Sequence, residues 1–475
     1  MLIAQRSVII LSSLFTKNFT MTLKISISGI RGTVPESLTP EVCLDFAKAF
    51  GTYLDGGKIV IGTDPRRSSE FIKGIIFSGL LSAGCEVVDL GICPTPTVGI
   101  MVRDLKADGG IVVTASHNPL PWNGIKFMRG DGIFLNETQA ARFIKIYEEK
   151  KFRVAVSRGV EADRSGINTH ISKVMKIVNP LPIRRKKLKV AVDACNGAGS
   201  VALVKLLEKL GCKVIGINID TRLPFPHPPE PTAENLTELR QLVKDKKADI
   251  GFAMDSDADR LAVVSEEGKP VGEELTLALA VNYILGRHPF LSQNKKIVVI
   301  NLSTTRAIDD ICRAHRATCI RTRVGEVNVA EELKNLKGLI GGEGNGGVIF
   351  PRVGYNRDSL TAAALLLSCM AGSGKKLSAL IREIPPYAMI KSKMECGNID
   401  EANDLVEKAK FLFKGEDMIL TEGVKVIFPD SWIHIRASNT EPIIRVIAEA
   451  GKKERAEGLI RKFSDSLRQN RTGHV

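Results

Sequence analysis

Three aspartates, Asp255, Asp257 and Asp259, stand at alternate positions in the segment MDSDADR of residues 254–260. Side chains at alternate positions of an extended segment point the same way, so the three carboxylates can converge on one cation. Carboxylates crowded in this way repel one another without a counter-ion, and hard oxygen ligands suit Mg²⁺ or Ca²⁺. A solvated acidic turn is the alternative interpretation. The pattern favours a divalent-metal site.

The same spacing fits the start of an EF-hand loop, in which Glu266 would take the twelfth position. Arg260 stands at the sixth position, where an EF-hand requires glycine. The flanking residues 249–254 and 261–264 are strand-like, whereas an EF-hand loop lies between helices. The sequence therefore argues against an EF-hand.

A serine stands at the end of a predicted strand in residues 109–119, GGIVVTASHNP. The β-branched run 111–113 predicts a buried strand, and the Asn-Pro pair at 118–119 is typical of a turn. Open α/β sheets bind ligands at the carboxyl ends of their strands, so Ser116 is a candidate for chemistry. This segment alone is equally compatible with a plain strand-ending turn.

A glycine-rich loop, GGEGNGG, follows the strand-like residues 339–340 and covers residues 341–347. Its five glycines permit a close approach of the backbone to a ligand. Glu343 supplies a hydrogen-bond acceptor, and Asn345 supplies both a donor and an acceptor. These groups suit the hydroxyls of a sugar.

A further loop, RASNTEP at residues 436–442, carries groups that suit a phosphate. With Arg445 in the next predicted strand, it provides two guanidiniums, two hydroxyls, an amide and turn N–H groups. A surface turn is the alternative. The side chains in question are Arg436, Ser438, Asn439, Thr440 and Arg445.

The four loops together fit phosphoryl transfer to and from a sugar phosphate, in which catalysis is mostly positioning and charge neutralisation. Two other classes remain open. A sugar-phosphate phosphatase would release inorganic phosphate without isomerising the sugar. A basic nucleic-acid-binding protein would bind duplex DNA with a steep salt dependence.

The composition of the chain bears on which of these function classes are plausible. The 475 residues include 67 Lys+Arg against 53 Asp+Glu, a net charge of +14 that would attract anions. The basic residues are dispersed and aromatics are only 5%, which argues against a base-stacking nucleic-acid platform. The nine cysteines form no C-x-x-C pair, and this predicts reduced thiols and a cytoplasmic location. No apolar run reaches the length of a membrane span.

Strand-like and helix-like segments alternate from residue 23, which implies three successive α/β domains with mixed or parallel sheets. Strands without intervening helices follow at the C-terminal end, so the last domain is expected to be α+β. Residues 29–33 are predicted as a glycine-bracketed loop and residues 93–96 as a proline-rich turn. The predicted domains are residues 22–160, 161–266, 267–384 and 385–475.

Residues 1–21 precede the first clear strand and are expected to be a dispensable extension or the product of a start site placed too early. Their short apolar stretch resembles the core of a signal peptide, but no small-residue cleavage site follows it. A cleaved signal is the weaker interpretation.

The chain resembles the α-D-phosphohexomutase superfamily. The resemblance rests on four motifs in the family's order and spacing, and it covers essentially everything from residue 23 onward. It implies four domains around a central cleft, each contributing one loop. The motifs are TASHNP at 114–119, DSDADR at 255–260, GEGNG at 342–346 and RASNTEP at 436–442.

This resemblance implies a mechanism. Ser116 would carry a phosphoryl group in the resting enzyme and coordinate one Mg²⁺ per active site together with Asp255, Asp257 and Asp259. The phosphoserine would donate to the substrate, giving a sugar bisphosphate that turns over in the site and returns its other phosphate to the serine. The sugar bisphosphate would also act as the activator.

The remaining site residues follow from the same resemblance. Lys126, in NGIKF, matches a lysine proposed to assist proton transfer, and Arg31, in GIRG, matches an arginine near the transferred phosphoryl group. His117 and Asn118 are expected to support the serine loop. The expected substrate-binding residues are Arg260, Glu343, Asn345, Arg436, Ser438, Asn439, Thr440 and Arg445.

Two departures from many bacterial relatives bear on the substrate. The motif EGNG at 343–346 replaces a serine and a histidine, and Glu326 stands where some relatives have histidine. With GGVIFP at 346–351, these features resemble the archaeal-type phosphoglucosamine mutase branch. Glucosamine phosphate is the expected substrate, with glucose and mannose phosphates as alternatives. The expected partner is this phosphorylated hexose, without nucleic acid or membrane, in a monomer or homodimer.

Overall fold

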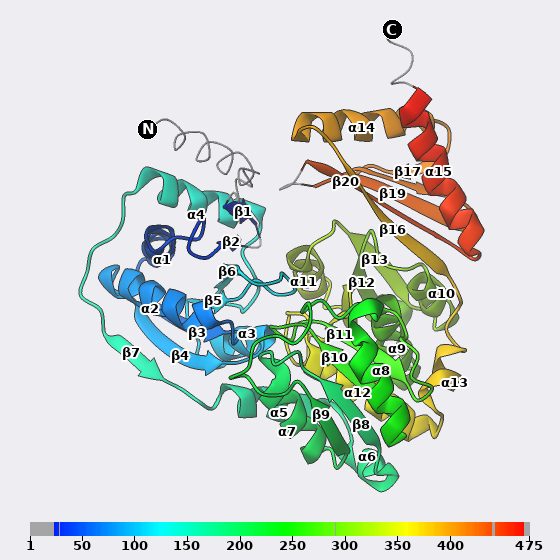
Figure 1. The fold of residues 1–475 in the computed structure, drawn as a ribbon, viewed down its shortest axis with the longest axis horizontal. Helices are drawn as coiled ribbons and strands as arrows, with labels where there is room; N and C mark the ends of the chain where they lie inside the picture. The colour runs from blue at the N-terminus through cyan, green and yellow to red at the C-terminus, as the bar shows by residue number, and fades with distance from the viewer. Residues whose placement is uncertain (1–22, 28, 290, 439–441, 470–475) are drawn as a thin grey trace, which may run out of the picture.

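The computed structural model describes residues 23–27, 29–289, 291–438 and 442–469 and contains four β-sheets, each with its own helices (Figure 1). In Figure 1 the first sheet lies at the left, the second below the centre, the third nearer the centre and the fourth at the upper right. The expected extension of residues 1–21 lies outside the described residues. Within the described part of the chain, no helix combines the length and apolar character needed to cross a membrane.

The first sheet has seven strands in the order β1-β2-β6-β5-β3-β4-β7. Strands β3, β4, β5 and β7 are parallel, and β1, β2 and β6 form an antiparallel extension. The strands are β1 (Lys24–Ser26), β2 (Gly29–Thr33), β3 (Lys58–Thr63), β4 (Glu86–Ile92), β5 (Gly109–Val113), β6 (Trp122–Arg129) and β7 (Gly159–Ala162). The accompanying helices are α1 (Pro40–Tyr53), α2 (Arg67–Ser82), α3 (Thr95–Asp104) and α4 (Glu137–Glu149).

Two local predictions in this region were wrong. Residues 29–33, predicted as a loop, form β2, because β1 and β6 pair with them on both sides. The proline-rich turn at 93–96 runs directly into α3, which the sequence analysis did not predict. Pro96 lies in the first turn of that helix, where the missing amide hydrogen costs nothing.

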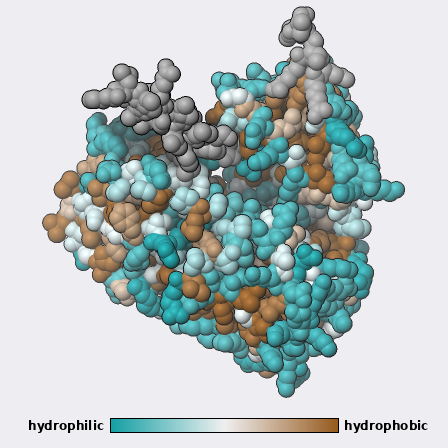
Figure 2. Space-filling model, in the orientation of Figure 1, coloured by the Kyte–Doolittle hydropathy of each residue, from teal (hydrophilic) through white to brown (hydrophobic). Residues whose placement is uncertain are grey.

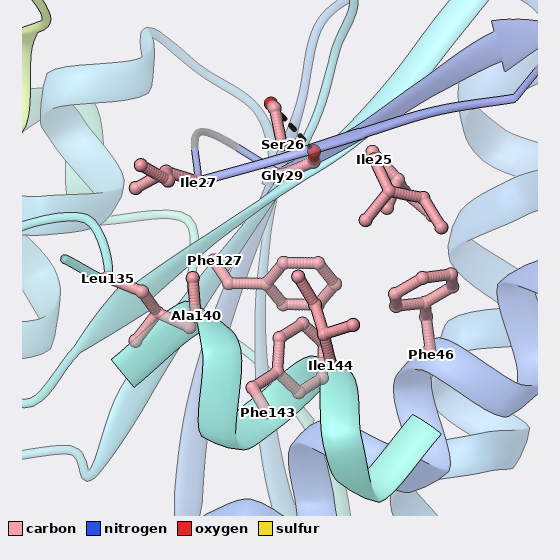
Figure 3. Close-up of a pocket in the computed structure, with 11 residues that line it drawn as sticks. Ile25, Ser26, Ile27, Gly29, Phe46, Phe127, Leu135, Ala140, Phe143 and Ile144 are labelled. Atoms are coloured by element: carbon pink, nitrogen blue, oxygen red, sulfur yellow. Dashed lines mark hydrogen bonds between the residues drawn. The ribbon is translucent and has the colours of Figure 1, made fainter. Parts of the chain in front are cut away.

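Local sequence explains α1 well. Thr39 caps the helix by accepting a hydrogen bond from the Val42 amide at 3.3 Å, and Pro40 begins it. Cys43, Phe46 and Phe50 form the buried face. Beneath β1, Phe46 lies near Phe127 and Phe143, and the three rings line part of a small pocket of about 10 Å³ (Figure 3).

The second and third sheets each combine a parallel trio with one antiparallel edge strand. The second has the order β11-β10-β8-β9 and the third β13-β12-β14-β15. Their strands are β8 (Lys189–Asp193), β9 (Lys213–Ile217), β10 (Ile250–Met254), β11 (Leu261–Ser265), β12 (Ile297–Asn301), β13 (Thr318–Thr322), β14 (Ile340–Glu343) and β15 (Gly347–Ile349).

Both sheets share one hydrophobic core. Helix α12 (Ser359–Ser373) is apolar on nearly all sides and packs against helices of both regions, so burial holds the second and third domains together. The other helices are α5 (Gly166–Ile177), α6 (Pro180–Lys186), α7 (Gly199–Lys209), α8 (Thr237–Lys246), α9 (Glu273–Arg287), α10 (Ala307–Ala314), α11 (Glu326–Asn335) and α13 (Leu377–Ile381), with 3₁₀ turns at Ala233–Leu236 and Gln293–Lys295.

The fourth sheet is antiparallel throughout and has a separate core. Its strand order is β16-β20-β19-β18-β17. This confirms the predicted fold class of three mixed-sheet α/β domains and a C-terminal α+β domain. The elements are β16 (Ala388–Glu395), α14 (Ile399–Leu412), β17 (Asp417–Ile419), β18 (Val424–Ile427), β19 (Ser431–Ala437), β20 (Ile443–Ala450) and α15 (Lys453–Gln469).

Candidate active site

Ser116 lies in the turn after β5, at the carboxyl end of the parallel strands of the first sheet. Its backbone has a φ of 51°, in the left-handed region that side chains other than glycine rarely adopt. Its amide donates to Thr114 Oγ1 at 2.8 Å, and its Oγ donates to Asp255 Oδ2 at 2.9 Å. The serine therefore contacts the acidic loop directly.

The buried guanidinium of Arg66 holds this turn in place. It donates to the carbonyl oxygens of Ser116, Asn118 and Trp122 at 2.5, 2.7 and 2.9 Å, and its Nε donates to Asp64 Oδ2 at 2.9 Å. Its side chain is fully buried. Three carbonyl groups that a turn would leave without partners are satisfied by one side chain.

Asp255, Asp257 and Asp259 converge, but by a different route from the one predicted. The segment is a tight turn after β10, with Ala258 at a φ of 56°, and it is not extended. Asp255 Oδ1 accepts hydrogen bonds from the amides of Asp259 and Arg260 at 3.1 and 3.2 Å, which closes the turn. One oxygen from each carboxylate lies within 4.8 Å of the others.

The first domain supplies the partners of this acidic turn. Thr95 Oγ1 and Lys126 Nζ donate to Asp257 Oδ2 at 2.6 and 2.7 Å. Ser256 Oγ donates to the carbonyl oxygen of Ser116 at 2.7 Å. The serine turn and the acidic turn thus form one buried unit across two domains.

The three carboxyls differ in acidity. Burial, reinforced by the neighbouring carboxylates, raises the pKa of Asp255 well above its usual range. Burial also opposes ionisation of Asp259, but Arg357, Lys126 and Arg260 outweigh it and lower that pKa. Lys126 likewise lowers the pKa of Asp257 against the effect of burial.

The acidic turn fits a divalent cation. Asp257 Oδ1 and Asp259 Oδ1 are buried and, within the described structure, have no hydrogen-bond partner. Buried polar atoms without a partner are costly, and a hard cation is the natural partner of carboxylate oxygens. The three aspartates can therefore hold a metal ion.

Most of the predicted binding residues line one cleft of about 660 Å³. The surface is hollowed between the first and fourth domains in the space-filling view (Figure 2). Ser116 and the three aspartates are buried beside it. The predicted residues that line the cleft are Arg31, His117, Asn118, Lys126, Arg260, Glu343, Asn345, Arg436, Ser438 and Arg445. Asn439 and Thr440 lie outside the described residues.

Several buried polar atoms of residues that line the cleft have no hydrogen-bond partner among the described residues. They include Nδ1 of His117, Oδ1 of Asn345 and the Nε atoms of Arg260 and Arg436. Burial, with Arg260 and Arg31 nearby, lowers the pKa of His117 to about 2, so its imidazole is neutral. These groups are ready to bind a polar, anionic ligand.

Asn118 and Arg31 join the serine turn to the cleft. Arg31, on β2, donates to Asn118 Oδ1 at 3.0 Å. Burial lowers the pKa of Arg31, an effect that Asp257 partly offsets. Because residues 29–33 form strand β2 and not the predicted loop, Arg31 lies beside the serine turn.

The arginines at the far end of the cleft lie on paired strands. Arg436 on β19 is directly opposite Arg445 on β20. Arg436 Nη1 lies 3.3 Å from Glu422 Oε1, which partly neutralises the pair. Two guanidiniums on paired strands that line the cleft suit a dianionic phosphate.

Sequence reasoning missed Arg357, a buried residue in the loop before α12. It donates to Asp259 Oδ2 at 2.5 Å and to Glu343 Oε2 at 2.7 Å, and its Nε lies 3.3 Å from Glu326 Oε2. It therefore connects the acidic turn to the glycine-rich loop. A single arginine in GYNRDS carries no local signal of this role.

Comparison with known proteins places this site in a family. A probable phosphoglucosamine mutase of Pyrococcus abyssi is 39% identical over 440 residues, covering 92% of this chain and 95% of the relative. Models of phosphoglucomutase/phosphomannomutase domains I, II and III match residues 23–154, 168–268 and 272–387, and the C-terminal domain model matches 389–466. The chain belongs to the phosphoglucomutase/phosphomannomutase family. It is accordingly a phosphohexomutase, an isomerase that acts as an intramolecular phosphotransferase.

A further sequence relative and two solved structures are also similar to this chain. A phosphoglucomutase/phosphomannomutase of Thermococcus kodakarensis is 38% identical, covering 90% of this chain and 94% of that protein. The crystal structure of a family protein from Burkholderia thailandensis has a TM-score of 0.81 at 26% identity, covering 94% and 99% of the two chains. The N-acetylphosphoglucosamine mutase of Aspergillus fumigatus, solved with GlcNAc-6P and magnesium, has a TM-score of 0.60 at 16% identity, covering 94% and 95%.

Proposed function

We propose that this phosphohexomutase interconverts glucosamine 6-phosphate and glucosamine 1-phosphate through a phosphoserine at Ser116. The observation that carries the phosphoserine is the placement of Ser116 Oγ 2.9 Å from Asp255, within the buried carboxylate cluster. The sugar is supported by relatives named probable phosphoglucosamine mutase at 36–39% identity.

The reaction would proceed in two balanced transfers. The phosphoryl group leaves Ser116 Oγ for the free hydroxyl of the bound sugar phosphate, which loses its proton. The resulting bisphosphate turns around in the cleft and returns its other phosphoryl group to Ser116. A bisphosphate of the same sugar would therefore also prime a dephosphorylated enzyme.

The residues at the reacting end would keep the serine in place and balance charge. Asp255, Asp257 and Asp259, with the phosphoryl oxygens on Ser116, would hold Mg²⁺. Mg²⁺ bound there would neutralise negative charge on the transferred group. Lys126, whose ammonium lies 2.7 Å from Asp257, would assist transfer of the proton from the sugar hydroxyl to the released serine oxygen.

The rest of the cleft would hold the sugar in both orientations. Glu343 and Asn345 would bind ring hydroxyls. Arg31, with Asn118 and His117, would face the phosphoryl group being transferred. The phosphate that does not react would be bound by Arg436, Ser438, Asn439, Thr440 and Arg445. Arg260, whose Nε lies 3.7 Å from Asp259 Oδ1, would bind the substrate beside the acidic turn.

The decisive test is the Ser116→Ala variant. We expect it to lose mutase turnover by at least about three orders of magnitude, because the only phosphoryl carrier is removed. Ser368→Ala is a matched control, since this buried hydroxyl in α12 has no hydrogen-bond partner within the described structure. The melting temperature of both variants should stay close to that of the wild type. Near-normal turnover in Ser116→Ala would contradict the proposal.

Coupled assays with the 1- and 6-phosphates of glucosamine, glucose and mannose, each primed with its bisphosphate, identify the sugar. We expect the highest kcat/KM with glucosamine phosphate. A preference for glucose or mannose phosphate would instead favour the activity in the name of the Thermococcus kodakarensis relative. Stoichiometric release of inorganic phosphate without isomer product would favour a phosphatase.

The cellular setting belongs to the same proposal. All nine cysteines are free thiols. Free thiols suit a reducing compartment, so we place the enzyme in the cytoplasm. It would work as a monomer or a homodimer, since one chain contains all the loops of the site.

A further inference from the structure

One wall of the cleft contains two buried carboxylates that share a single cation. Glu343, in the glycine-rich loop, and Glu326, the first residue of α11, both contact Arg357. Arg357 Nη1 donates to Glu343 Oε2 at 2.7 Å, and the amide of Arg357 donates to Glu326 Oε1 at 2.9 Å. The three residues line the cleft together.

Three hydrogen bonds hold the carboxylate of Glu343 in place. Its Oε1 accepts from Asn301 Nδ2 at 2.8 Å and from the Gly325 amide at 3.0 Å, and its Oε2 accepts from Arg357. This fixes the orientation of the carboxylate against which the sugar ring would lie. The Gly325 amide also joins Glu343 to the residue that precedes Glu326, so the two carboxylates are neighbours.

Glu326 has one carboxylate oxygen that accepts no hydrogen bond within the described residues. Its Oε2 lies 3.3 Å from Arg357 Nε, yet that Nε is unpaired, so the contact is not a hydrogen bond. Arg357 also donates a hydrogen bond to Asp259 Oδ2 at 2.5 Å. Within the described part of the chain, no other cation lies within 4.0 Å of Glu326 or Glu343. Burial raises the pKa of Glu326 to about 7, although Arg357 and Lys126 oppose this effect. A further cation beside Glu326 would therefore stabilise its carboxylate form.

We propose that Glu326 binds the 2-ammonium group of an amino-sugar phosphate and thereby selects amino sugars over neutral hexoses. This rests on the proposed phosphohexomutase activity toward glucosamine phosphate. The ammonium is the cationic group that distinguishes this substrate from glucose and mannose phosphates. With Glu343 holding the ring, a substituent on the adjacent ring carbon comes within reach of Glu326 Oε2.

The energetic reason is the cost of a buried charge without a counter-ion. With a neutral sugar, Glu326 is either protonated or buried as a carboxylate without a full counter-ion, whereas an ammonium pairs with the carboxylate. A site built for one hydrogen-bonding group discriminates strongly against an analogue that lacks it. Because the ring turns around during catalysis, the contact is expected in one of the two bound orientations. Its loss lowers kcat/KM equally in both directions, since the overall equilibrium constant is unchanged.

The test compares Glu326→Gln with the wild type on the phosphates of glucosamine and glucose. We expect the ratio of kcat/KM between glucosamine 6-phosphate and glucose 6-phosphate to fall about tenfold. Glu326→Asp keeps the charge and should retain most of the preference. Glu230→Gln is the matched control, because Glu230 also lines the cleft but pairs with Arg260 at 3.4 Å. In this variant the ratio of kcat/KM between the two sugars should stay unchanged.

The outcomes separate this inference from the proposed function. A ratio within twofold of wild type in Glu326→Gln overturns the role of Glu326. An equal loss on both sugars in Glu326→Gln and Glu326→Asp indicates a structural role and overturns it as well. If the wild-type enzyme does not isomerise glucosamine phosphate at all, the proposed sugar fails, whatever the variants do.

Discussion

The carboxyl groups of the acidic turn lie close together, but their pKa values are shifted in opposite directions. Asp255 has a raised pKa because it is buried among other acids, whereas Asp259 has a lowered pKa because Arg357, Lys126 and Arg260 outweigh its burial. Ser116 Oγ donates to the carboxyl with the raised pKa. Surroundings rather than residue type therefore decide the charge of each acid.

Glu274, beside the glycine-rich loop, provides a test of this principle away from the metal site. Burial raises its pKa from 4.5 to about 7, although Lys391 partly offsets the effect. Between pH 4.5 and about 7, the protein therefore binds a proton at Glu274 when it folds. The resulting stabilisation is full below pH 4.5 and is lost as the pH rises through about 7.

We expect the Glu274→Gln variant to become more stable relative to wild type as the pH rises from about 5 to about 8, by up to about 3 kcal/mol. Denaturant unfolding at several pH values measures the difference. Glu273→Gln is the control, because it removes an ion pair with the same Lys391 at 3.3 Å from a more exposed side chain. A stability difference for Glu274→Gln that is flat with pH would contradict the prediction.

At the scale of elements, turns at strand ends rather than the strands themselves carry the chemistry. The serine turn after β5 adopts a left-handed conformation at Ser116, and Arg66 satisfies its carbonyl groups. The acidic turn after β10 docks on it through Ser256. Each turn is therefore shaped by residues distant in the sequence.

The Arg66→Met variant tests the role of this arginine. Removing it leaves Asp64 buried without its counter-ion, so we expect a loss of about 3–5 kcal/mol in the free energy of unfolding. The same change should lower kcat, because the turn that presents Ser116 loses three hydrogen bonds. Denaturant unfolding and steady-state kinetics measure the two effects.

Arg313→Met is the control for Arg66→Met. The Arg313 side chain is 74% exposed and pairs with Asp310 at the surface, so its loss should cost at most about 1 kcal/mol. The interpretation of Arg66 would be wrong if both variants lost stability equally.

At the scale of the whole molecule, the four domains are joined unequally. The second and third share a hydrophobic core around α12, whereas the fourth has a separate core and contacts the third through polar groups. Glu449 on β20 is central to this contact. Its Oε2 accepts from the Arg306 amide at 2.8 Å and from Trp432 Nε1 at 2.6 Å.

We expect the Glu449→Ala variant to raise KM for the sugar phosphate about tenfold, because two buried donors lose their acceptor and the fourth domain is held less firmly over the cleft. The proposed phosphorylation of Ser116, in the first domain, should be unaffected by this change and can be measured by intact mass. Glu454→Ala, at an exposed position of α15, is the matched control. Loss of Ser116 phosphorylation in Glu449→Ala would argue against this division of roles.

Much of this arrangement follows from local sequence. Apolar periodicity and capping residues predict elements such as α1, because helix and strand geometry depends on neighbouring residues. The alternation of strands and helices predicts the fold class. The motifs that contain Ser116, Asp255, Glu343 and Arg436 mark the four loops, because each concentrates polar side chains directly after a predicted strand.

Other features depend on contacts between distant segments. Residues 29–33 resemble a loop by composition, yet pairing with β6 makes them a strand and carries Arg31 to the serine turn. The aspartates converge through a turn closed by hydrogen bonds to Asp255, not through alternation along a strand. No sequence motif marks Arg66 or Arg357. Each guanidinium acquires its role only when folding buries it among groups that are remote in sequence.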